Sequence, residues 1–321
     1  MERPAGALSP QLGPRTLPGT MEVLLSGASG LVGTALVASL RTCGYGVRRL
    51  VRRSSGLAFG DYAWDPERGA LDREALAGAS AVIHLAGESL ASGRWNERKK
   101  RAILESRIRG TRLIAEAIAG LGAGAPDLLS ASAVGYYGTR GDEVLAEGSA
   151  PGSGFLAGVC REWEAAAAAA EAGGVRVVRL RFGMVLSGRG GALAKMLPVF
   201  RARGGARIGD GRQYVSWVSL TDAARAVLHV LADRTISGPV NVVAPAPVTN
   251  AEFTKTLGKV LGRPVFLAVP GFVVRLALGE MADEVLLASV RAQPAKLLAS
   301  GFSFAHPDLE SALRAALGGE C

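Results

Sequence analysis

The sequence predicts a doubly wound parallel α/β sheet with a small, mostly helical lobe at its C-terminal end. Short apolar segments alternate with segments of helical periodicity over most of residues 21–245, which is typical of parallel strands connected by helices. A glycine-rich turn at 27–33 joins the first apolar segment to the first helix. From Thr249 onward the pattern is helical, with Thr249 or Asn250 as the N-cap and Glu252 in the first turn.

The period of the apolar residues gives the expected elements in order. The expected strands are residues 21–26, 47–51, 81–86, 128–133, 175–180, 214–218 and 240–243. The expected helices are residues 32–40, 95–119, 155–172, 192–203 and 220–231. Asp61 and Asp65 fall between these segments and are expected in turns.

Three parts are expected along the chain. Residues 1–20 are rich in Pro, Gly, Ala and Arg and lack the apolar core of a secretory signal, so we expect a disordered extension with Met21 as the functional start. Residues 21–245 are expected to form the core together with interleaved segments of the substrate lobe. Residues 246–321 are expected to form a helical domain on the substrate side. No low-complexity linker separates the parts, which favours one compact body.

Composition excludes several classes of protein. Hydrophobic residues make up 49% of the 321 residues and charged residues 20%, which is ordinary for a packed globular protein. The net charge of +9 is dispersed, and its densest run, 98–101, is expected on a solvated helix face, so no nucleic-acid partner is expected. No apolar run reaches the roughly 18 residues that cross a membrane. Three cysteines without paired spacing and three histidines indicate a cytoplasmic protein without a metal site.

The turn at 27–33 has the composition of a phosphate-binding loop. Gly27, Gly30 and Gly33 follow a strand and open a helix, so the backbone can approach a diphosphate at the positive end of the helix dipole. Without a Cβ, Gly33 also lets the helix pack closely on the strand. The alternative is an ordinary strand-to-helix turn, but the full strand, turn and helix context favours a Rossmann-type dinucleotide site.

The residue type at the end of the second expected strand indicates whether a Rossmann-type site binds NAD or NADP. NAD-binding proteins usually place Asp or Glu there for the ribose 2′-hydroxyl, whereas a guanidinium suits the 2′-phosphate of NADP. This chain has Arg52 and Arg53 and no acidic residue at the position. The alternative is a pair of solvated arginines. We expect NADP as the cofactor.

Several motifs together indicate a family. The glycine loop is combined with His84-Leu-Ala-Gly-Glu88. Further motifs follow in order: Arg94-Trp95, Ser106-Arg107-Ile108, Ser130–Gly138, Trp163-Glu164, Gly188–Gly191, Gly209–Gln213, Ser216-Trp217, Asn241 and Gly301–Phe304. From Met21 nearly to its end, the chain resembles the atypical, extended short-chain dehydrogenases/reductases. Within them it is similar to the epimerase-family subgroup of the mammalian 39U proteins and the bacterial YfcH-like proteins.

The resemblance implies a Rossmann core, NADP(H) binding, a small C-terminal helical domain and a substrate that is not generally established. It also implies cofactor contacts by residues in the glycine loop, at three strand ends and in one helix. They are Gly27, Ser29, Gly30, Leu31, Val32, Gly33, Arg52, Arg53, Leu85, Ala86, Gly87, Arg107 and Val185.

The usual proton relay of these enzymes is missing from the chain. Short-chain dehydrogenases use Ser or Thr with Tyr-x-x-x-Lys on a helix, where the ammonium lowers the tyrosine pKa so that the phenol can exchange a proton. Ser132 fits the serine position, but Phe155 and Val159 stand where Tyr and Lys belong. The resembling subgroup shares this departure. Tyr136 or Tyr137 is the candidate acid, and the alternative is that both tyrosines only pack beneath the loop.

Other polar and aromatic residues have two interpretations. Trp217 and Gln213 are expected either to line a substrate cleft or, for Trp217, to pack in the core. Arg181 and Lys195 are candidate contacts for an anion, and Trp163 is expected in the core.

Two functions remain open. The first is an NADP(H)-dependent oxidoreductase or epimerase acting on an unidentified small polar substrate, as a monomer or homodimer. The second is a non-catalytic NADP(H)-binding sensor or partner-binding protein that lacks the proton relay.

Overall fold

The computed structural model describes residues 21–52, 55–203 and 205–318, so the extension predicted at 1–20 lies outside the described residues. Its centre is an eight-stranded sheet. In spatial order the strands are β13 (Gly238–Val242), β8 (Val177–Phe182), β6 (Asp127–Ala133), β5 (Ala79–His84), β1 (Glu22–Ser26), β2 (Gly46–Val51), β3 (Asp61–Asp65) and β4 (Ala70–Leu71). All neighbouring strands are parallel except β3 and β4. The predicted doubly wound, mainly parallel sheet is confirmed.

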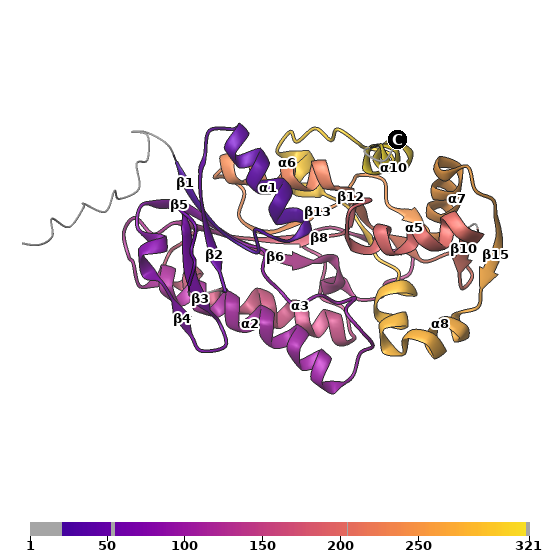
Figure 1. Ribbon diagram of the computed structural model, residues 1–321, viewed down its shortest axis with the longest axis horizontal. Coiled ribbons are helices and arrows are strands. Elements are labelled where there is room, and N and C mark those ends of the chain that lie inside the picture. Colours follow the sequence, from indigo (N-terminus) through magenta and orange to yellow (C-terminus); the bar gives the residue numbers. More distant parts are fainter. Residues whose placement is uncertain (1–20, 53–54, 204, 319–321) are drawn as a thin grey trace, which may run out of the picture.

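Helices cover both faces of this sheet (Figure 1). One face carries α1 (Leu31–Thr42) and α6 (Leu220–Ala232), and the other carries α2 (Glu97–Ala119), α3 (Phe155–Ala165) and α4 (Ala168–Ala172). Successive residues of β1 point to opposite faces: Val23 and Leu25 pack with α1 and α6, and Leu24 packs with α2 and α4. Strands buried on both faces explain the continuous apolar runs in the sequence.

The chain also contains short strands and helices that are not part of the eight-stranded sheet and its five main covering helices. The short strands pair as β9 (Met184–Leu186) with β12 (Trp217–Ser219), β10 (Gly205–Ile208) with β15 (Val265–Val269), β11 (Tyr214–Val215) with β14 (Val248–Thr249), and β7 (Val144–Leu145) with β16 (Arg291–Ala292). The remaining helices are η1 (Arg73–Leu76), η2 (Val134–Tyr137), α5 (Gly191–Arg203), α7 (Asn250–Leu261), α8 (Gly271–Leu278), η3 (Ala282–Leu286), α9 (Ala295–Ala299) and α10 (Leu309–Leu317).

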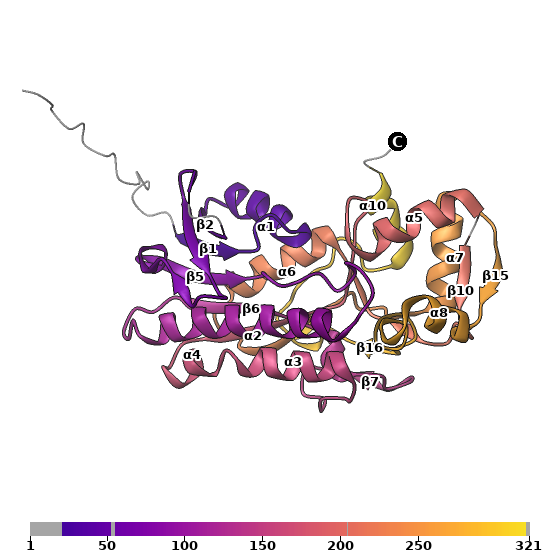
Figure 2. The same cartoon turned by 60° about the horizontal axis from the view of Figure 1, so that its bottom comes forward.

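The C-terminal lobe has a hydrophobic core of its own. Side chains of α5, α7 and α10 pack around the fully buried Trp217. Figure 2 shows these helices beside one another at the end of the molecule away from β3 and β4. The chain then returns to the sheet, because Leu297 and Phe302 pack in the core of the sheet with α1 and α6. The boundary expected between residues 245 and 246, which separates the core from the C-terminal helical domain, stays a prediction.

Local signals explain where the lobe's main helix begins and ends. The Thr249 hydroxyl accepts a hydrogen bond from the Glu252 amide, and the Glu252 carboxylate accepts one from the Thr249 amide. This capping box satisfies two amides of the first turn of α7. Gly262 ends the helix in a left-handed conformation that favours glycine.

Three expectations about local structure were wrong. Asp61 and Asp65, expected in turns, begin and end the strand β3, and the buried Asp61 carboxylate accepts a hydrogen bond from Arg49 Nε at 2.7 Å. The helix expected at 155–172 is broken into α3 and α4. The tail after Thr249 contains the strand β15 between Pro264 and Pro270, because a proline is disfavoured in the interior of a helix; Pro270 then begins α8 as its N-cap.

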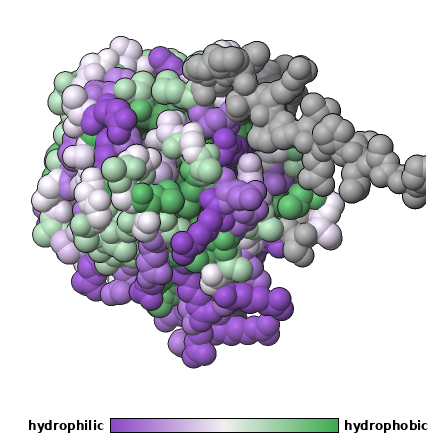
Figure 3. All heavy atoms as spheres, turned by 90° about the vertical axis from the view of Figure 1, so that its left-hand side faces the viewer, coloured by the Kyte–Doolittle hydropathy of each residue, from purple (hydrophilic) through white to green (hydrophobic). Residues whose placement is uncertain are grey.

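The surface of the described residues is mixed in character. Figure 3 looks at the end of the molecule that carries β3 and β4, where hydrophilic and hydrophobic residues are interspersed. In the described part of the chain, every helix is too short or too polar to cross a membrane.

Candidate functional site

The candidate site lies where the order of the strands reverses. From β1 the chain continues to β2, β3 and β4 on one side, and it crosses to β5, β6, β8 and β13 on the other. In doubly wound sheets the carboxyl ends of the strands at this switch point form a crevice for ligands. The glycine loop follows β1 directly, so it lies in this crevice.

The glycines of the loop leave no room for side chains. A Cβ on Gly33 would lie 2.1 Å from the Gly27 carbonyl oxygen, and one on Gly27 would lie 2.8 Å from the Ala86 amide nitrogen. Gly27 also has a φ of +74°, which favours glycine. Gly30 is the N-cap of α1 and provides no capping side chain. The first amides of α1 therefore face the crevice without a side chain over them, and this arrangement fits a diphosphate.

Segments far apart in sequence surround the loop. Leu85, Ala86 and Gly87 continue β5 beside it. On the other side, Gly190 and Gly191 lie against the Leu31 side chain, since a Cβ on either glycine would come within 3.3 Å of it. Val185 in β9 precedes these glycines and is partly buried. The structure therefore brings the predicted loop, strand-end and Val185 segments next to one another.

Below the loop, Ser26 and His84 join the ends of β1 and β5. The Ser26 hydroxyl lies 2.6 Å from His84 Nδ1, and the histidine is fully buried. Its Nε2 has no hydrogen-bond partner in the described part of the chain. Burial lowers the pKa of His84 to about 4, so the ring is neutral at physiological pH. His84 begins the motif His84–Glu88, but the motif alone predicts no role for its side chain.

Arg52 directly follows β2, at the same edge of the sheet. Its side chain is exposed, and its charge helps to lower the pKa of Glu88, but none of the carboxylates within the described ranges forms an ion pair with it. Arg53, the second predicted phosphate contact, lies outside the described residues. Arg52 is therefore available to an anion beside the glycine loop.

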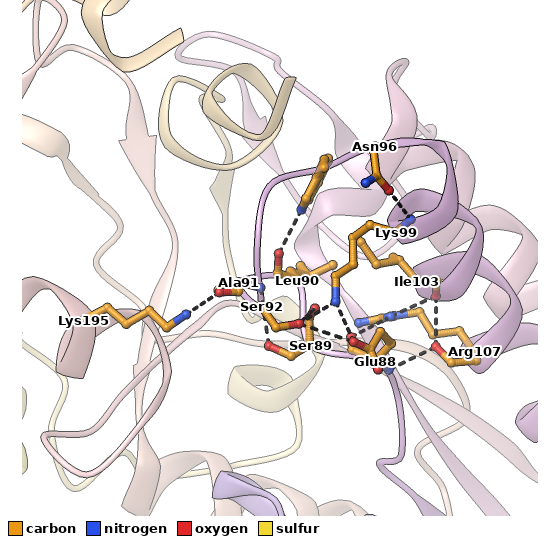
Figure 4. A network of polar contacts seen from close by, with 12 residues as sticks. Glu88, Ser89, Leu90, Ala91, Ser92, Asn96, Lys99, Ile103, Arg107 and Lys195 are labelled. Atoms are coloured by element: carbon orange, nitrogen blue, oxygen red, sulfur yellow. Dashed lines mark hydrogen bonds and ion pairs between the residues drawn. The ribbon is translucent and has the colours of Figure 1, made fainter. Parts of the chain in front are cut away.

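Arg107 lies under the strand end at Gly87 (Figure 4). Its Nη1 donates to the carbonyl oxygens of Glu88 at 3.1 Å and Ile103 at 2.9 Å, and its guanidinium lies 5.0 Å from the ring centroid of Trp163. Burial lowers the pKa of Arg107 below its usual range. Glu88, which pairs with Lys99, acts on this guanidinium through its charge without forming an ion pair with it, so a further anionic group beside the loop would stabilise the Arg107 charge.

The loop after β5 is held from both sides. Lys99 Nζ contacts Glu88 Oε1 at 2.5 Å and also donates to Ser92, and the bond from Lys99 lowers the pKa of Glu88. Lys195 of α5 donates to the Ala91 carbonyl oxygen from the other side of the crevice (Figure 4). Lys195, predicted as an anion contact, therefore joins the lobe to this loop.

The predicted catalytic hydroxyls lie in or beside a buried polar network at the ends of β6 and β8. The Ser132 hydroxyl donates to Glu164 Oε1 at 2.7 Å, and both Glu164 oxygens also accept from Arg181, at 2.7 and 2.8 Å. Arg181 Nη1 donates to the Tyr137 hydroxyl at 3.0 Å, which donates to Asn241 Oδ1 at 2.8 Å. The ion pair with Glu164 corrects the expectation that Arg181 contacts an anion from outside.

The two tyrosines differ in exposure. Tyr137 is fully buried, and this burial raises the pKa of its hydroxyl. Tyr136 is partly exposed, and its ring lies over the Arg181 guanidinium with 3.6 Å between Cζ and the ring centroid. No hydrogen bond to the Tyr136 hydroxyl is formed by the described residues. Arg181 therefore contacts both tyrosines, but only Tyr136 keeps a hydroxyl without a protein partner.

The start of α3 carries no group that moves a proton. The Phe155 ring packs edge-on against Trp95 at 5.3 Å, and Lys100 Nζ lies 4.9 Å from its centroid. Val159 is buried one turn later. The Glu284 carboxylate accepts hydrogen bonds from the amides of Phe155 and Leu156, both at 2.9 Å, and joins η3 to this helix. The helix position of the usual relay is thus occupied by apolar packing.

Three further candidates have structural roles. Trp217 is fully buried and donates to the Ala246 carbonyl oxygen, so the core interpretation holds and the cleft interpretation was wrong. Gln213 is buried and donates to the carbonyl oxygens of Ile208 and Leu286, which joins segments of the lobe. Trp163 is buried as expected.

Comparisons with known proteins now assign the family. The model of the NAD dependent epimerase/dehydratase family matches residues 23–243, and the domain of unknown function DUF1731 matches residues 269–316. The chain belongs to the NAD dependent epimerase/dehydratase family. The family resemblance expected from the motifs, to short-chain dehydrogenases/reductases of the epimerase type, is confirmed.

Relatives align over nearly the whole chain. Epimerase family protein ML0860 of Mycobacterium leprae is 45% identical, over 91% of this chain and 94% of the relative. The crystal structure of human epimerase family protein SDR39U1 with NADPH has a TM-score of 0.83 at 33% identity, covering 93% of this chain and 99% of that chain. The nucleoside-diphosphate sugar epimerase of Corynebacterium glutamicum has a TM-score of 0.77 at 38% identity; the match covers 94% of this chain but only 59% of that chain.

Proposed function

We propose that this chain is an NADP(H)-dependent oxidoreductase or epimerase that acts on a small polar substrate. The observation that carries the cofactor choice is Arg52, whose guanidinium follows β2 beside the glycine loop and pairs with no carboxylate in the described ranges. A 2′-phosphate would accept two hydrogen bonds from it, whereas the ribose hydroxyl of NAD would leave its charge unpaired. The NADPH in the human relative's crystal structure supports this choice.

The remaining proposed cofactor contacts are the residues that surround the glycine loop. We assign the diphosphate to the amides at the start of α1, the adenosine ribose to the end of β5, and the nicotinamide end to the region of Arg107 and Val185. The proposed contacts are Gly27, Ser29, Gly30, Leu31, Val32, Gly33, Arg52, Leu85, Ala86, Gly87, Arg107 and Val185, together with Arg53 outside the described residues.

Calorimetric titration with NADPH and NADH tests the cofactor assignment. Arg52→Ala is expected to weaken NADPH binding by roughly 10- to 100-fold, because a charge-assisted hydrogen bond contributes about 1.5–3 kcal/mol. NADH binding should not change. Arg68→Ala removes an equally charged but exposed side chain away from the crevice and is the matched control. Equal affinities of the wild type for NADPH and NADH would contradict the assignment.

For the chemical step we propose Tyr136 as the proton donor. When bound, the nicotinamide would exchange a hydride with a carbon of the substrate. The chain must then supply a proton to the substrate oxygen. Ser132 and Tyr137 already donate to Glu164 and Asn241, whereas the Tyr136 hydroxyl is partly exposed and has no partner among the residues described. We therefore keep Ser132 and Tyr137 as residues that position Tyr136 through Arg181.

Single-turnover oxidation of NADPH separates these roles. Tyr136→Phe should slow the chemical step by about 100-fold or more, since proton transfer by a positioned side chain contributes about that factor. Its NADPH affinity and unfolding free energy should stay close to those of the wild type. Tyr137→Phe removes a buried hydroxyl between Arg181 and Asn241, so it should lower the unfolding free energy by about 1–3 kcal/mol. Unchanged turnover in Tyr136→Phe would exclude it as the acid.

The second candidate function is a non-catalytic NADP(H)-binding sensor or partner-binding protein. Phe155 and Val159 favour it, because neither side chain can move a proton at the start of α3. This function predicts tight NADPH binding without consumption of NADPH across a panel of carbonyl compounds and nucleoside-diphosphate sugars. The sugars belong in the panel because the Corynebacterium relative is described as a nucleoside-diphosphate sugar epimerase.

We further propose that the protein works in the cytoplasm. Cys43 is exposed and Cys160 is buried, and neither forms a disulfide, which suits a reducing compartment. Fractionation of cells that express the tagged full chain tests this proposal.

A further inference from the structure

The strand β15 and the helix α8 expose large apolar side chains to solvent. The exposed fractions are 89% for Phe266, 62% for Leu267, 68% for Phe272 and 77% for Leu276. Pro270 alone separates the two elements in the chain, and Figures 1 and 2 show both at the end of the lobe that points away from the sheet. We call these four residues the β15–α8 face. Clustered exposure of this kind is typical of an interaction surface.

One edge of β15 is open. The strand pairs in parallel with β10, and no other strand of the described chain pairs with it. Its sequence, Val265-Phe-Leu-Ala-Val269, contains no charge, proline or glycine. Natural proteins usually protect an edge strand with one of these devices, since free amides and carbonyls invite another strand. An apolar, unprotected edge is therefore expected to be covered by a partner.

We propose that the partner is a second copy of this chain, joined through β15 of each copy. A two-fold axis makes identical strands run antiparallel, and antiparallel strands exchange hydrogen bonds along their free edges. An axis beside Leu267 pairs all five residues of β15. It places Leu267 opposite its own copy, Phe266 opposite Ala268 of the second copy, and Val265 opposite Val269. The result is one four-stranded sheet with β10 on each outer edge.

The surface area and the charge favour this partner. Large aromatic side chains bury about 150–250 Å² each, so Phe266 and Phe272 with the two leucines expose on the order of 500 Å². The backbone edge of β15 adds to this, and a standard interface buries about 800 Å² on each partner. No charged residue occurs between Arg263 and Arg275, and Arg275 pairs with Asp283 at 2.8 Å. The net charge of +9 is thus kept away from the paired strands.

Sedimentation equilibrium over a wide range of protein concentration tests the proposal. The wild type should dimerise, and Leu267→Lys should raise the dimer dissociation constant by about 100-fold or more, because it places two like charges opposite each other at the axis. Leu298→Lys is the matched control: Leu298 is an exposed leucine of α9, and its substitution should leave the dimer intact. Leu298→Lys should keep the wild-type melting temperature, whereas Leu267→Lys should melt like the wild type at concentrations too low for dimerisation, because the dimer itself adds stability.

Hydrogen exchange provides a second readout at the strand itself. The amides of β15 that face its open edge should exchange slowly in the wild-type dimer and fast in Leu267→Lys, whereas those that face β10 are bonded in both. If Leu267→Lys fails to fold, Ala268→Lys replaces it, since Ala268 is also exposed.

Three outcomes would overturn the proposal. They are a monomeric wild type at every concentration, equal dimerisation of Leu267→Lys and wild type, and a monomer that binds phosphatidylserine vesicles through Leu267. The last outcome would assign the face to a membrane surface. None of these measurements depends on cofactor binding or turnover. A failed test of dimerisation would therefore leave the proposed function unchanged, and a failed test of the proposed function would leave dimerisation unchanged.

Discussion

The glycine loop at 27–33 and the network around Arg181 both lie at the carboxyl edge of the sheet, but they hold their geometry in different ways. The loop takes its shape from close approaches of the backbone, which leave no room for a side chain at Gly33. The network takes its shape from side-chain bonds between distant residues, such as Tyr137 and Asn241, which are 104 positions apart. The loop is therefore specified by a few adjacent residues, whereas the network exists only once the sheet has formed.

This difference bears on function. A crevice of backbone amides binds a diphosphate whatever the neighbouring side chains are, so it persists when the catalytic residues change. The network occupies the ends of β6 and β8, and it holds Ser132 and Tyr137 in buried bonds. In the proposed site, the cofactor half thus keeps the usual pattern of short-chain dehydrogenases/reductases, and the catalytic half departs from it, as the sequence already indicates at Phe155 and Val159.

Removing Arg181 is expected to have the largest effect, because the network depends on its charge. Arg181→Met leaves the Glu164 carboxylate buried without its cation, and breaking a buried pair in this way costs about 3–5 kcal/mol. It also removes the donor to the Tyr137 hydroxyl. The unfolding free energy in urea should fall by that amount, with NADPH affinity at low temperature close to that of the wild type.

Arg179→Met is the matched control for this change. Arg179 lies two positions earlier on β8 and pairs with Glu171, whose side chain is well exposed, so its loss should cost less than about 1 kcal/mol. Equal losses of unfolding free energy in Arg181→Met and Arg179→Met would show that burial of the Arg181–Glu164 pair does not increase the cost of breaking it.

Much of the fold was predictable from the sequence because its signals are local. Buried strands appear as apolar runs, and the helix α7 begins at Thr249, one of the two expected N-cap residues. The strand β3 escaped prediction because it has Asp61 and Asp65 at its ends, and only Trp64 among its apolar residues is buried. The strand β15 escaped because it is short and its apolar residues resemble one side of a helix.

The two halves of the site were not equally predictable. The spacing of three glycines and the position of Arg52 are enough to propose a phosphate crevice. The role of Glu164 had no local signal, because its partners Ser132 and Arg181 are 32 and 17 positions away. Arg181 was expected to contact an anion, and the anion it contacts is this buried carboxylate of its own chain.

The crevice can be tested by adding a single methyl group. Gly33→Ala places a Cβ 2.1 Å from the Gly27 carbonyl oxygen, so the loop must move. Overpacking costs about 1–3 kcal/mol, and an approach this close to a backbone oxygen lies at the upper end of that range, whereas alanine gains roughly 1 kcal/mol over glycine within a helix. We expect a loss of about 2 kcal/mol in thermal or urea unfolding, with NADPH binding lost in calorimetry.

Gly148→Ala is the control, because a Cβ there meets nothing within 4 Å and its φ is not positive. It should leave both stability and binding unchanged. Wild-type NADPH affinity in Gly33→Ala would mean that the diphosphate does not rest on this loop.

The last predicted effect is a pH dependence of stability that comes from His84, which lies beneath the loop. Its folded pKa of about 4 is below the value of 6.5 expected for the unfolded chain, so the unfolded state takes up a proton first as the pH falls. The stabilising contribution is complete above about pH 6.5 and is lost towards pH 4, with about 2 kcal/mol of the unfolding free energy lost between pH 7 and pH 5. His84→Asn should remove this part of the pH dependence in urea titrations, while His229→Gln should keep it. A slope that is equal in His84→Asn and wild type would mean that His84 takes up its proton at the same pH in the folded and unfolded states, so that burial does not shift its pKa.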